Sequence, residues 1–475
     1  MIRHPVSGIT RKSASARSIN KNRVRMEAIK EFKGLWWLPD DIENQVSGTL
    51  IVKKDKIVLE TIGVFGSKSP IEHFAGGNVP QYNVIWGISS DAKKISVFNC
   101  YESMSLNTDC PFPVAKYSVQ VVAVGKHIKS LDETGDYDVK AYIEELSYWF
   151  RPNIIHICQQ GKDLSYSTDL ENANQIAVTL DDGCKLGLEG EVNISHGKTG
   201  MQITINQMSF LYFACSRPIS MNDAKYNVFL FEQFLSFATL TPVQSDRFLL
   251  IDKNKEGAPT KNKTIEIYEK KDERSNDPER FWEFLFVYET IKDSFSSIIC
   301  KWYAEKDMFP IRAHLIDSVG HRGTFCSNDF LIVAQAVEGF YCRFREDGPN
   351  LTTILKNLRN EFSDISILEL SDDDIKCIRN SRHYFSHLLP PGKKEHVVDG
   401  HELYNLNHKL RKLLLCCMLN FVGFSNQEIN VIFSRSHNSY LRMISGEERE
   451  IIDDEPVELK GEVLSTTQIS EAFPE

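Results

Sequence analysis

The sequence has no CxxC pair, no apolar run of membrane-spanning length and no excess of positive charge. Its eleven Cys are scattered, so neither a zinc ribbon nor a disulfide framework is expected, and a reducing, cytoplasmic setting fits best. The most apolar stretch, residues 413–424, is about 12 residues long, whereas a membrane-spanning helix needs roughly 20. These absences favour a protein without a membrane anchor.

The overall charge is negative. Lys and Arg number 55 against 65 Asp and Glu, which gives a net charge of −10 and an isoelectric point of about 5.8. This charge argues against binding of nucleic acid through overall charge, so any such contact must use a local basic patch. The 475 residues, 42% of them hydrophobic, suffice for two or three globular domains with apolar cores.

The charges are distributed unevenly along the chain. Residues 1–27 are rich in Arg, Lys and Ser, and no acid occurs before Glu27. Residues 446–475 are strongly acidic, with ten Asp or Glu against Arg449 and Lys460. This composition predicts a basic flexible tail over residues 1–27 and an acidic flexible tail over residues 446–475.

The first half of the chain has the period of β-strands. Short β-branched and aromatic runs are separated by Gly, Asn and Asp, which is typical of a β-sandwich or barrel. One helix, over residues 224–239, is expected to interrupt them. Trp36 and Trp37 favour a core role in the opening strand over a ligand platform. We predict a β-rich domain over residues 28–252 and a linker over 253–276 that contains one weak strand. The expected strands lie at 46–52, 56–62, 82–88, 94–100, 117–124, 174–180 and 201–206.

After Asp277 the hydrophobic period becomes helical. Asp277 and Pro278 suit the start of a long amphipathic helix that reaches Trp302. Further helices are expected over 328–346, 371–388 and 401–424, and Ser425 and Glu428 have the spacing of a capping box for another. The sequence therefore predicts an α+β chain whose residues 277–445 form a helical bundle.

One segment of this bundle gathers groups that can act on a phosphate. Arg379, Arg382, His383 and His387 lie within one expected helix, which ends before Pro390. Arginine is suited to gripping phosphate, and histidine can transfer a proton near neutral pH. This combination suits cleavage of RNA without a metal. The surrounding residues 376–412 carry eight bases against three acids, and the candidates for RNA binding are Arg379, Lys409, Arg411 and Lys412.

Two other interpretations of the segment remain open. His383 and His387 are four residues apart, a spacing that can hold zinc, and His396 or His401 would supply a further ligand. Alternatively, the segment is a solvated basic helix face with a histidine in its last turn, where the helix dipole favours the protonated form.

Residues 382–387 resemble the R-x4-H signature of HEPN ribonuclease domains, with Arg382 and His387 at its two ends. Residues 330–341 look like the apolar helix, ending near Glu338, that precedes the motif helix in the ApeA-like branch. In the first half, residues 34–39, 48–50 and 95–100 resemble the N-terminal domain of ApeA-type abortive-infection proteins. The resemblance spans about residues 30–445.

This resemblance implies an antiphage protein whose β-rich domain senses a phage-derived trigger and whose helical domain cuts RNA, with the tRNA anticodon as the expected target. It implies catalytic roles for Arg382, His387 and His383, a supporting role for Glu338, a two-fold dimer through the helical domain, and no cofactor or metal. The alternative is a non-catalytic module that binds RNA or protein.

Overall fold

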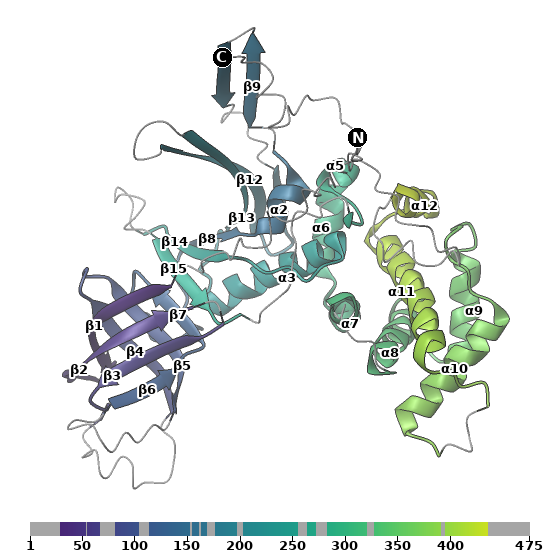
Figure 1. The fold of residues 1–475 in the computed structure, drawn as a ribbon, viewed down its shortest axis with the longest axis horizontal. Coiled ribbons are helices and arrows are strands. Elements are labelled where there is room, and N and C mark those ends of the chain that lie inside the picture. Colours follow the sequence, from purple (N-terminus) through teal and green to yellow (C-terminus); the bar gives the residue numbers. More distant parts are fainter. Residues whose placement is uncertain are drawn as a thin grey trace, which may run out of the picture.

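The computed structural model has a β-rich N-terminal part followed by a helical C-terminal part, which confirms the predicted α+β class (Figure 1). The basic and acidic tails and the expected helix start at Asp277 lie outside the described residues. The structure describes residues 29–53, 55–66, 81–103, 114–152, 154–160, 163–168, 176–196, 203–254, 264–271, 283–320, 327–390 and 395–435.

Six strands close into a small barrel. In the order β5-β4-β1-β2-β3-β6 each strand pairs with the next, and β6 pairs back with β5. The barrel has its own apolar core, in which Trp36 and Leu50 are fully buried. Trp37 is also buried, so the prediction of a core role for both tryptophans is confirmed. The strands are β1 (Lys30–Leu38), β2 (Asp41–Val52), β3 (Ile57–Ile62), β4 (Gln81–Ser89), β5 (Lys94–Ser103) and β6 (Val114–Ser118).

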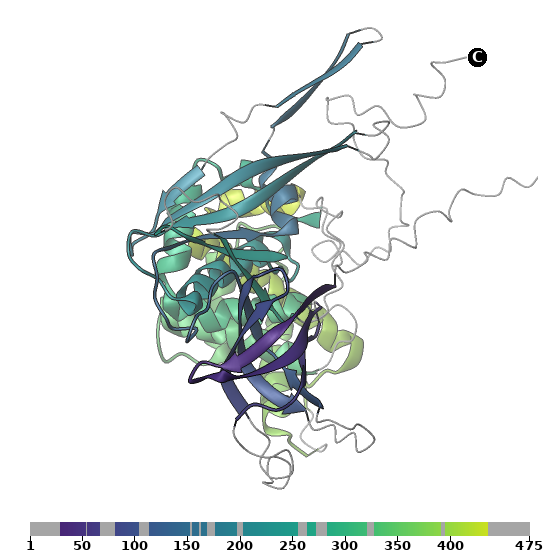
Figure 2. The ribbon, with the colours of Figure 1, turned by 90° about the vertical axis from the view of Figure 1, so that its left-hand side faces the viewer.

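An open sheet continues from β5 through β7, β15, β14, β8, β13 and β12 to β11. Thr264–Glu269, expected as a weak strand within a linker, is β15 and lies between β14 and β7, so this part of the expected linker belongs to the sheet. Figure 2 shows the β9–β10 and β12–β13 hairpins projecting from the body. The strands are β7 (Val121–Val124), β8 (Tyr137–Tyr142), β9 (Ile155–Gln160), β10 (Asp163–Thr168), β11 (Ile176–Thr179), β12 (Lys185–His196), β13 (Ile203–Ala214), β14 (Arg247–Asp252) and β15 (Thr264–Glu269).

A disulfide joins Cys184 and Cys215, which corrects the expectation of a chain without disulfides. Lys185 pairs with Ala214 in the β12–β13 ladder, so the two cysteines continue that register and lie opposite each other, with their Cα atoms 4.4 Å apart. Their separation of 31 residues gives no spacing signal, which is why the sequence did not reveal the pair.

Four helices pack near the open sheet: α2 (Glu144–Phe150), α3 (Met221–Thr239), α5 (Tyr288–Ile291) and α6 (Phe295–Ala304). The predicted helix over 224–239 is α3. The predicted long helix to Trp302 is wrong, because within the described residues it is broken into α5 and α6. Trp149 of α2 donates to the Phe286 carbonyl (2.9 Å) and Trp302 of α6 donates to the Leu230 carbonyl (2.9 Å), which ties this segment to the β-rich part.

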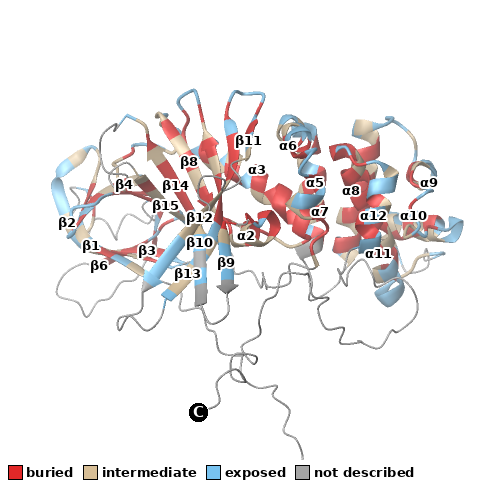
Figure 3. Cartoon of the chain, turned by 90° about the horizontal axis from the view of Figure 1, so that it is seen from above, coloured by how far each residue is buried: buried red, intermediate tan, exposed pale blue. Residues whose placement is uncertain are grey.

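The helical part is built around α11, which is buried along most of its length (Figure 3). Its core is continuous with that of the open sheet, whereas the barrel core is separate. None of the described helices combines the length and apolar character of a membrane span. The elements are η2 (Lys306–Met308), α7 (Phe309–Gly320), α8 (Ser327–Phe344), α9 (Leu351–Glu361), α10 (Asp372–His387), α11 (Gly400–Val422) and α12 (Asn426–Arg435).

Candidate active site

Helix α10 carries the predicted motif, and its ends are defined by local sequence. Ser371 and Asp374 form a capping box at the N-terminus, and Asp372 to Asp374 place negative charge in the first turn, where the helix dipole favours it. Ile375 and Ile378 bury one face against the bundle. The helix ends at Leu388, which has a left-handed backbone (φ 48°), so His387 occupies the last turn.

Arg382 points toward the neighbouring helix α8. Its Nη2 lies 2.9 Å from Oε2 of Glu338, and both side chains are about one-third exposed (30% and 31%). An ion pair of this exposure adds little to folding stability, but it restricts the guanidinium to one orientation. Glu338 is therefore placed to position Arg382.

His383 and His387 lie on the exposed side of α10. Their ring centroids are 4.8 Å apart with the planes at 61°, as expected for positions one helical turn apart. Ser386 donates a hydrogen bond to the Arg382 carbonyl. Each imidazole is exposed to solvent and can meet a ligand from outside. Among the described residues, no group of three His, Cys, Asp or Glu is arranged to hold a metal ion, so the zinc interpretation lacks a third ligand there.

The predicted RNA-binding residues differ in exposure: Arg379 and Lys409 reach the surface, whereas Arg411 and Lys412 are buried. Arg379 is exposed and donates to Asn380 Oδ1 (2.9 Å), beside the motif. Lys409 of α11 instead pairs with Asp374 of α10 (2.8 Å). Burial alone would raise the pKa of Asp374, but hydrogen bonds from Lys409 and Ser371 lower it overall. Lys409 therefore connects two helices.

Arg411 and Lys412 are both 3% exposed, which corrects their assignment as RNA-binding residues. Arg411 donates to the hydroxyl and carbonyl oxygens of Ser318 in α7. Burial lowers the pKa of Arg411 to about 10 and that of Lys412 to about 8. The reason is the position of α11: neighbouring helices surround its middle, so Arg411 and Lys412 lie inside, whereas Glu402 near its start is exposed.

Lys376 is a further base on α10 that sequence reasoning did not single out. It is exposed and lies three residues before Arg379 and seven before His383, which places all three on one face of α10. The helical period of the exposed bases was the signal that could have revealed it. With His387, this face forms a basic stripe along the helix.

The chain thus joins a β-rich part to a helical part in which a capped helix carries Arg382, His383 and His387. The chain matches the family models of ApeA N-terminal domain 1 over residues 31–302 and Apea-like HEPN over residues 331–428. The first match covers more than half of the sequence, and the chain belongs to the ApeA family. It has no significant match among curated proteins or solved structures.

These two domains are those of an antiphage defence nuclease family, and the helical domain is of a ribonuclease type. The HEPN match includes α10 and most of α8, the two helices that carry Arg382 and Glu338.

Proposed function

We propose that the protein is an endoribonuclease in which Arg382, His383 and His387 of α10 form the catalytic site. The observation that carries this proposal is the position of the motif within the HEPN region, with Arg382 held by Glu338 and both imidazoles open to solvent. Phosphodiester cleavage requires a group that stabilises the developing negative charge and a group that transfers a proton. The guanidinium held by Glu338 can do the first, and the accessible imidazoles can do the second.

The reaction is an attack of a ribose 2′-hydroxyl on the adjacent phosphorus. The O–P bond to the next nucleotide breaks, which leaves a 2′,3′-cyclic phosphate and a 5′-hydroxyl. His387 takes part in proton transfer, Arg382 stabilises the charge that develops on the phosphorane, and His383 orients the substrate. Glu338 supports the site by positioning Arg382. No metal or other cofactor is needed for these steps.

RNA contacts extend from the motif along the exposed face of α10. Arg379 and Lys376 supply phosphate contacts on the N-terminal side of His383. Lys409 stabilises α10 through Asp374 and contributes to the surface charge nearby. Arg411 and Lys412 take no part, because they are buried.

The active form is a two-fold dimer through the helical domain. On a straight helix, Arg382 and His387 are about 140° apart around the axis. In one chain, Arg382 is directed to α8 whereas His387 contacts His383. A second copy of the chain, related by two-fold symmetry, would complete the site from the other side.

The biological role is defence by abortive infection. The β-rich domain senses a phage-derived trigger, and the helical domain then cuts host RNA, with tRNA at the anticodon as the substrate. Its location is the cytoplasm, where both trigger and tRNA are found. The proposal is supported by membership of the ApeA family and by the pairing of an N-terminal β-rich domain with a ribonuclease-type domain.

Three single-alanine variants of the full chain test the proposal. Arg382→Ala and His387→Ala abolish RNA cleavage and host toxicity during phage infection, whereas His401→Ala, an exposed histidine outside the motif, behaves as wild type. All three unfold at temperatures close to that of wild type, because each position is at least partly exposed.

Cleavage that persists in both motif variants removes these residues from the mechanism. If the wild-type protein binds RNA but leaves it intact even in infected cells, a non-catalytic binding module is the correct interpretation. Activity that EDTA abolishes and zinc restores contradicts the metal-independent chemistry.

A further inference from the structure

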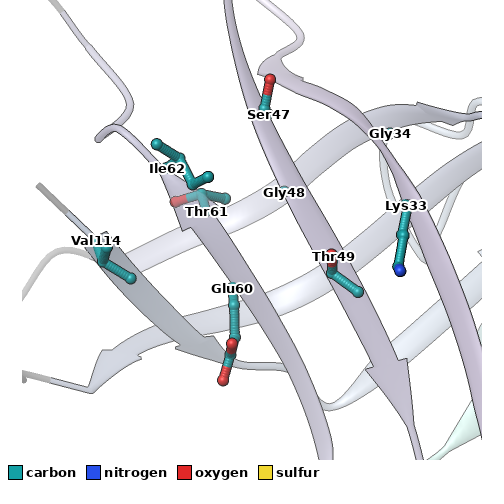
Figure 4. Close-up of a pocket in the computed structure, with 9 residues that line it drawn as sticks. All are labelled: Lys33, Gly34, Ser47, Gly48, Thr49, Glu60, Thr61, Ile62 and Val114. Atoms are coloured by element: carbon teal, nitrogen blue, oxygen red, sulfur yellow. The ribbon is translucent and has the colours of Figure 1, made fainter. Parts of the chain in front are cut away.

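The outer face of the barrel contains a hollow of about 370 Å³ that crosses β1, β2, β3 and β6 (Figure 4). Its centre lies over β2, where Ser47, Gly48 and Thr49 have small side chains. Longer side chains on the neighbouring strands, Lys33 and Ile62 among them, form its walls. This hollow lies on the β-rich domain, far along the chain from the motif on α10.

Two paired glycines lie in the strands beneath the hollow. Gly34 of β1 lies opposite Gly48 of β2. A Cβ atom on Gly34 would lie 2.0 Å from the Ile88 carbonyl oxygen, and one on Gly48 would lie 2.5 Å from the Glu60 carbonyl oxygen. Neither position accepts a side chain without moving backbone, so the close approach of these strands is fixed by sequence.

An apolar row crosses the barrel at one side of the hollow. The pairing register aligns one residue from each of five strands, and directly opposite residues share a face. Three of its apolar residues are exposed: Ile88 by 37%, Leu35 by 41% and Ile62 by 55%. Exposed apolar side chains that adjoin one another mark an interaction site more often than isolated ones do. The apolar row consists of Ile88, Leu35, Ile62 and Val114, with the small polar Ser47 between Leu35 and Ile62.

A charged row runs parallel to it, two residues away along each strand. It consists of Lys33, Thr49, Glu60 and Lys116. Glu60 and Lys116 form an ion pair (2.9 Å). The Lys33 ammonium group is exposed and has no ion pair or hydrogen bond within the described ranges. The row therefore offers one uncompensated cation next to the apolar row.

We propose that this face of the barrel binds an extended segment of a polypeptide partner that carries one acidic side chain on one side and apolar side chains on the other. Side chains of an extended chain point alternately to opposite sides. A segment that lies between the two rows would thus direct a carboxylate to Lys33 and apolar groups to Leu35 and Ile62. The hydroxyl groups of Ser47 and Thr49 are placed to hydrogen-bond its backbone.

The charges and the apolar row favour a polypeptide over RNA. A phosphate backbone repeats negative charge at every nucleotide and is bound mainly by Lys and Arg. Here Glu60 neutralises Lys116, and one side of the hollow is apolar. Five strands spaced about 4.8 Å apart span roughly 19 Å, which matches about six residues of extended chain.

A displayed library of random peptides, selected on the full-length protein, tests the proposal. The enriched peptides are synthesised, and their affinities are measured by fluorescence polarisation for wild type and three variants. Ser47→Trp fills the hollow and Lys33→Glu reverses its unpaired charge. Lys53→Glu makes the same charge change at an exposed position at the end of β2 and serves as the matched control.

We expect the enriched peptides to carry one acidic residue flanked on both sides by apolar residues. Their affinity falls about tenfold or more in Ser47→Trp and Lys33→Glu and changes less than about twofold in Lys53→Glu, because binding energy concentrates at few contacts. Circular dichroism and the thermal midpoint check that each variant is folded.

Three results overturn the proposal: no peptide is enriched, the enriched peptides lack acidic residues, or they bind folded Ser47→Trp and Lys33→Glu as tightly as wild type. Random-sequence RNA that binds this face and loses affinity in Ser47→Trp also overturns it. None of these readouts depends on ribonuclease activity, so the outcome is independent of the function proposed for α10.

Discussion

At the scale of single residues, the charged side chains near the motif differ in their exposure to solvent. Arg382 is partly exposed and positioned by Glu338, while Lys412 on the neighbouring helix is almost fully buried. A substitution in the first group is expected to affect chemistry, and one in the second to affect stability. Sequence composition grouped these residues as one basic stretch, because position in the bundle cannot be deduced from charge alone.

Lys412 gives a prediction with a defined pH range. Burial lowers its pKa from 10.5 to about 8, so the unfolded chain holds the proton more tightly than the folded one. The resulting destabilisation is fully present below pH 8 and disappears as the pH rises to about 10.5. We expect Lys412→Met to increase the free energy of unfolding at pH 7 by up to about 3 kcal/mol.

The measurement is urea denaturation of wild type and Lys412→Met at several pH values, with Lys53→Met as an exposed control. The difference between wild type and Lys412→Met should shrink above pH 8, while the control stays near zero throughout. A Lys412→Met variant that is less stable than wild type at pH 7 would mean that the buried ammonium group contributes favourably to folding.

At the scale of helices and strands, the sequence predicted best those helices whose first residues have capping motifs. The expected capping box at Ser425 begins α12, and the expected helix from Ser371 is α10, whose capping box the structure adds. The expected helix to Trp302 failed because apolar spacing continues across the break between α5 and α6. Similarly, one expected strand over 117–124 is divided between β6 and β7.

The pairing of strands could not be predicted from the sequence. Residues 264–269 have a weak strand pattern and charged surroundings, yet β15 is an interior strand of the sheet. The hollow on the barrel is lined by residues of β1, β2, β3 and β6 that only the strand pairing brings together. Such contacts depend on register between distant segments, which local periodicity does not encode.

The C-terminus of α10 gives a prediction for an element. Leu388 has φ 48° and its side chain is 85% exposed, so it has backbone strain and little packing. Glycine adopts this conformation without a Cβ clash. We expect Leu388→Gly to stabilise the protein by about 1 kcal/mol. This is the net effect, because the greater flexibility of glycine in the unfolded chain offsets part of the relieved strain.

Thermal unfolding measures this effect, and Leu388→Ala serves as the matched variant, because alanine retains the Cβ atom. Leu388→Gly should unfold at a higher temperature than both Leu388→Ala and wild type. Equal or lower stability would indicate that the exposed leucine contacts another chain or another part of the protein.

At the scale of the whole molecule, the structure has two apolar cores. The boundary between them lies between the barrel and the open sheet, and not between the β-rich and helical parts. The open sheet shares one apolar core with the helical part, and the barrel has a core of its own. Trp302 is buried against α3, and Phe286 packs on Phe424 with ring centroids 5.6 Å apart. The sheet and the helical part are therefore expected to unfold together.

Calorimetry should accordingly resolve two transitions, one for the barrel and one for the rest. Leu59→Ala removes a fully buried side chain of the barrel and lowers only the barrel transition, whereas Trp302→Ala lowers only the other. Each costs about 2–5 kcal/mol, as is usual for such truncations. If both variants shift the same transition, the two cores are energetically coupled.

The central claim, that α10 cuts RNA by attack of the 2′-hydroxyl group, is tested most directly by the chemistry of the new RNA ends. Purified full-length protein is incubated with total tRNA and an extract of phage-infected cells in excess EDTA, beside His387→Ala and the His401→Ala control, and the ends are sequenced with and without enzymatic opening of cyclic phosphates. We predict 2′,3′-cyclic phosphate and 5′-hydroxyl ends with wild type and His401→Ala and none with His387→Ala. Ends with a 5′-phosphate and a 3′-hydroxyl, or cyclic phosphate ends of equal yield from His387→Ala, would contradict the claim.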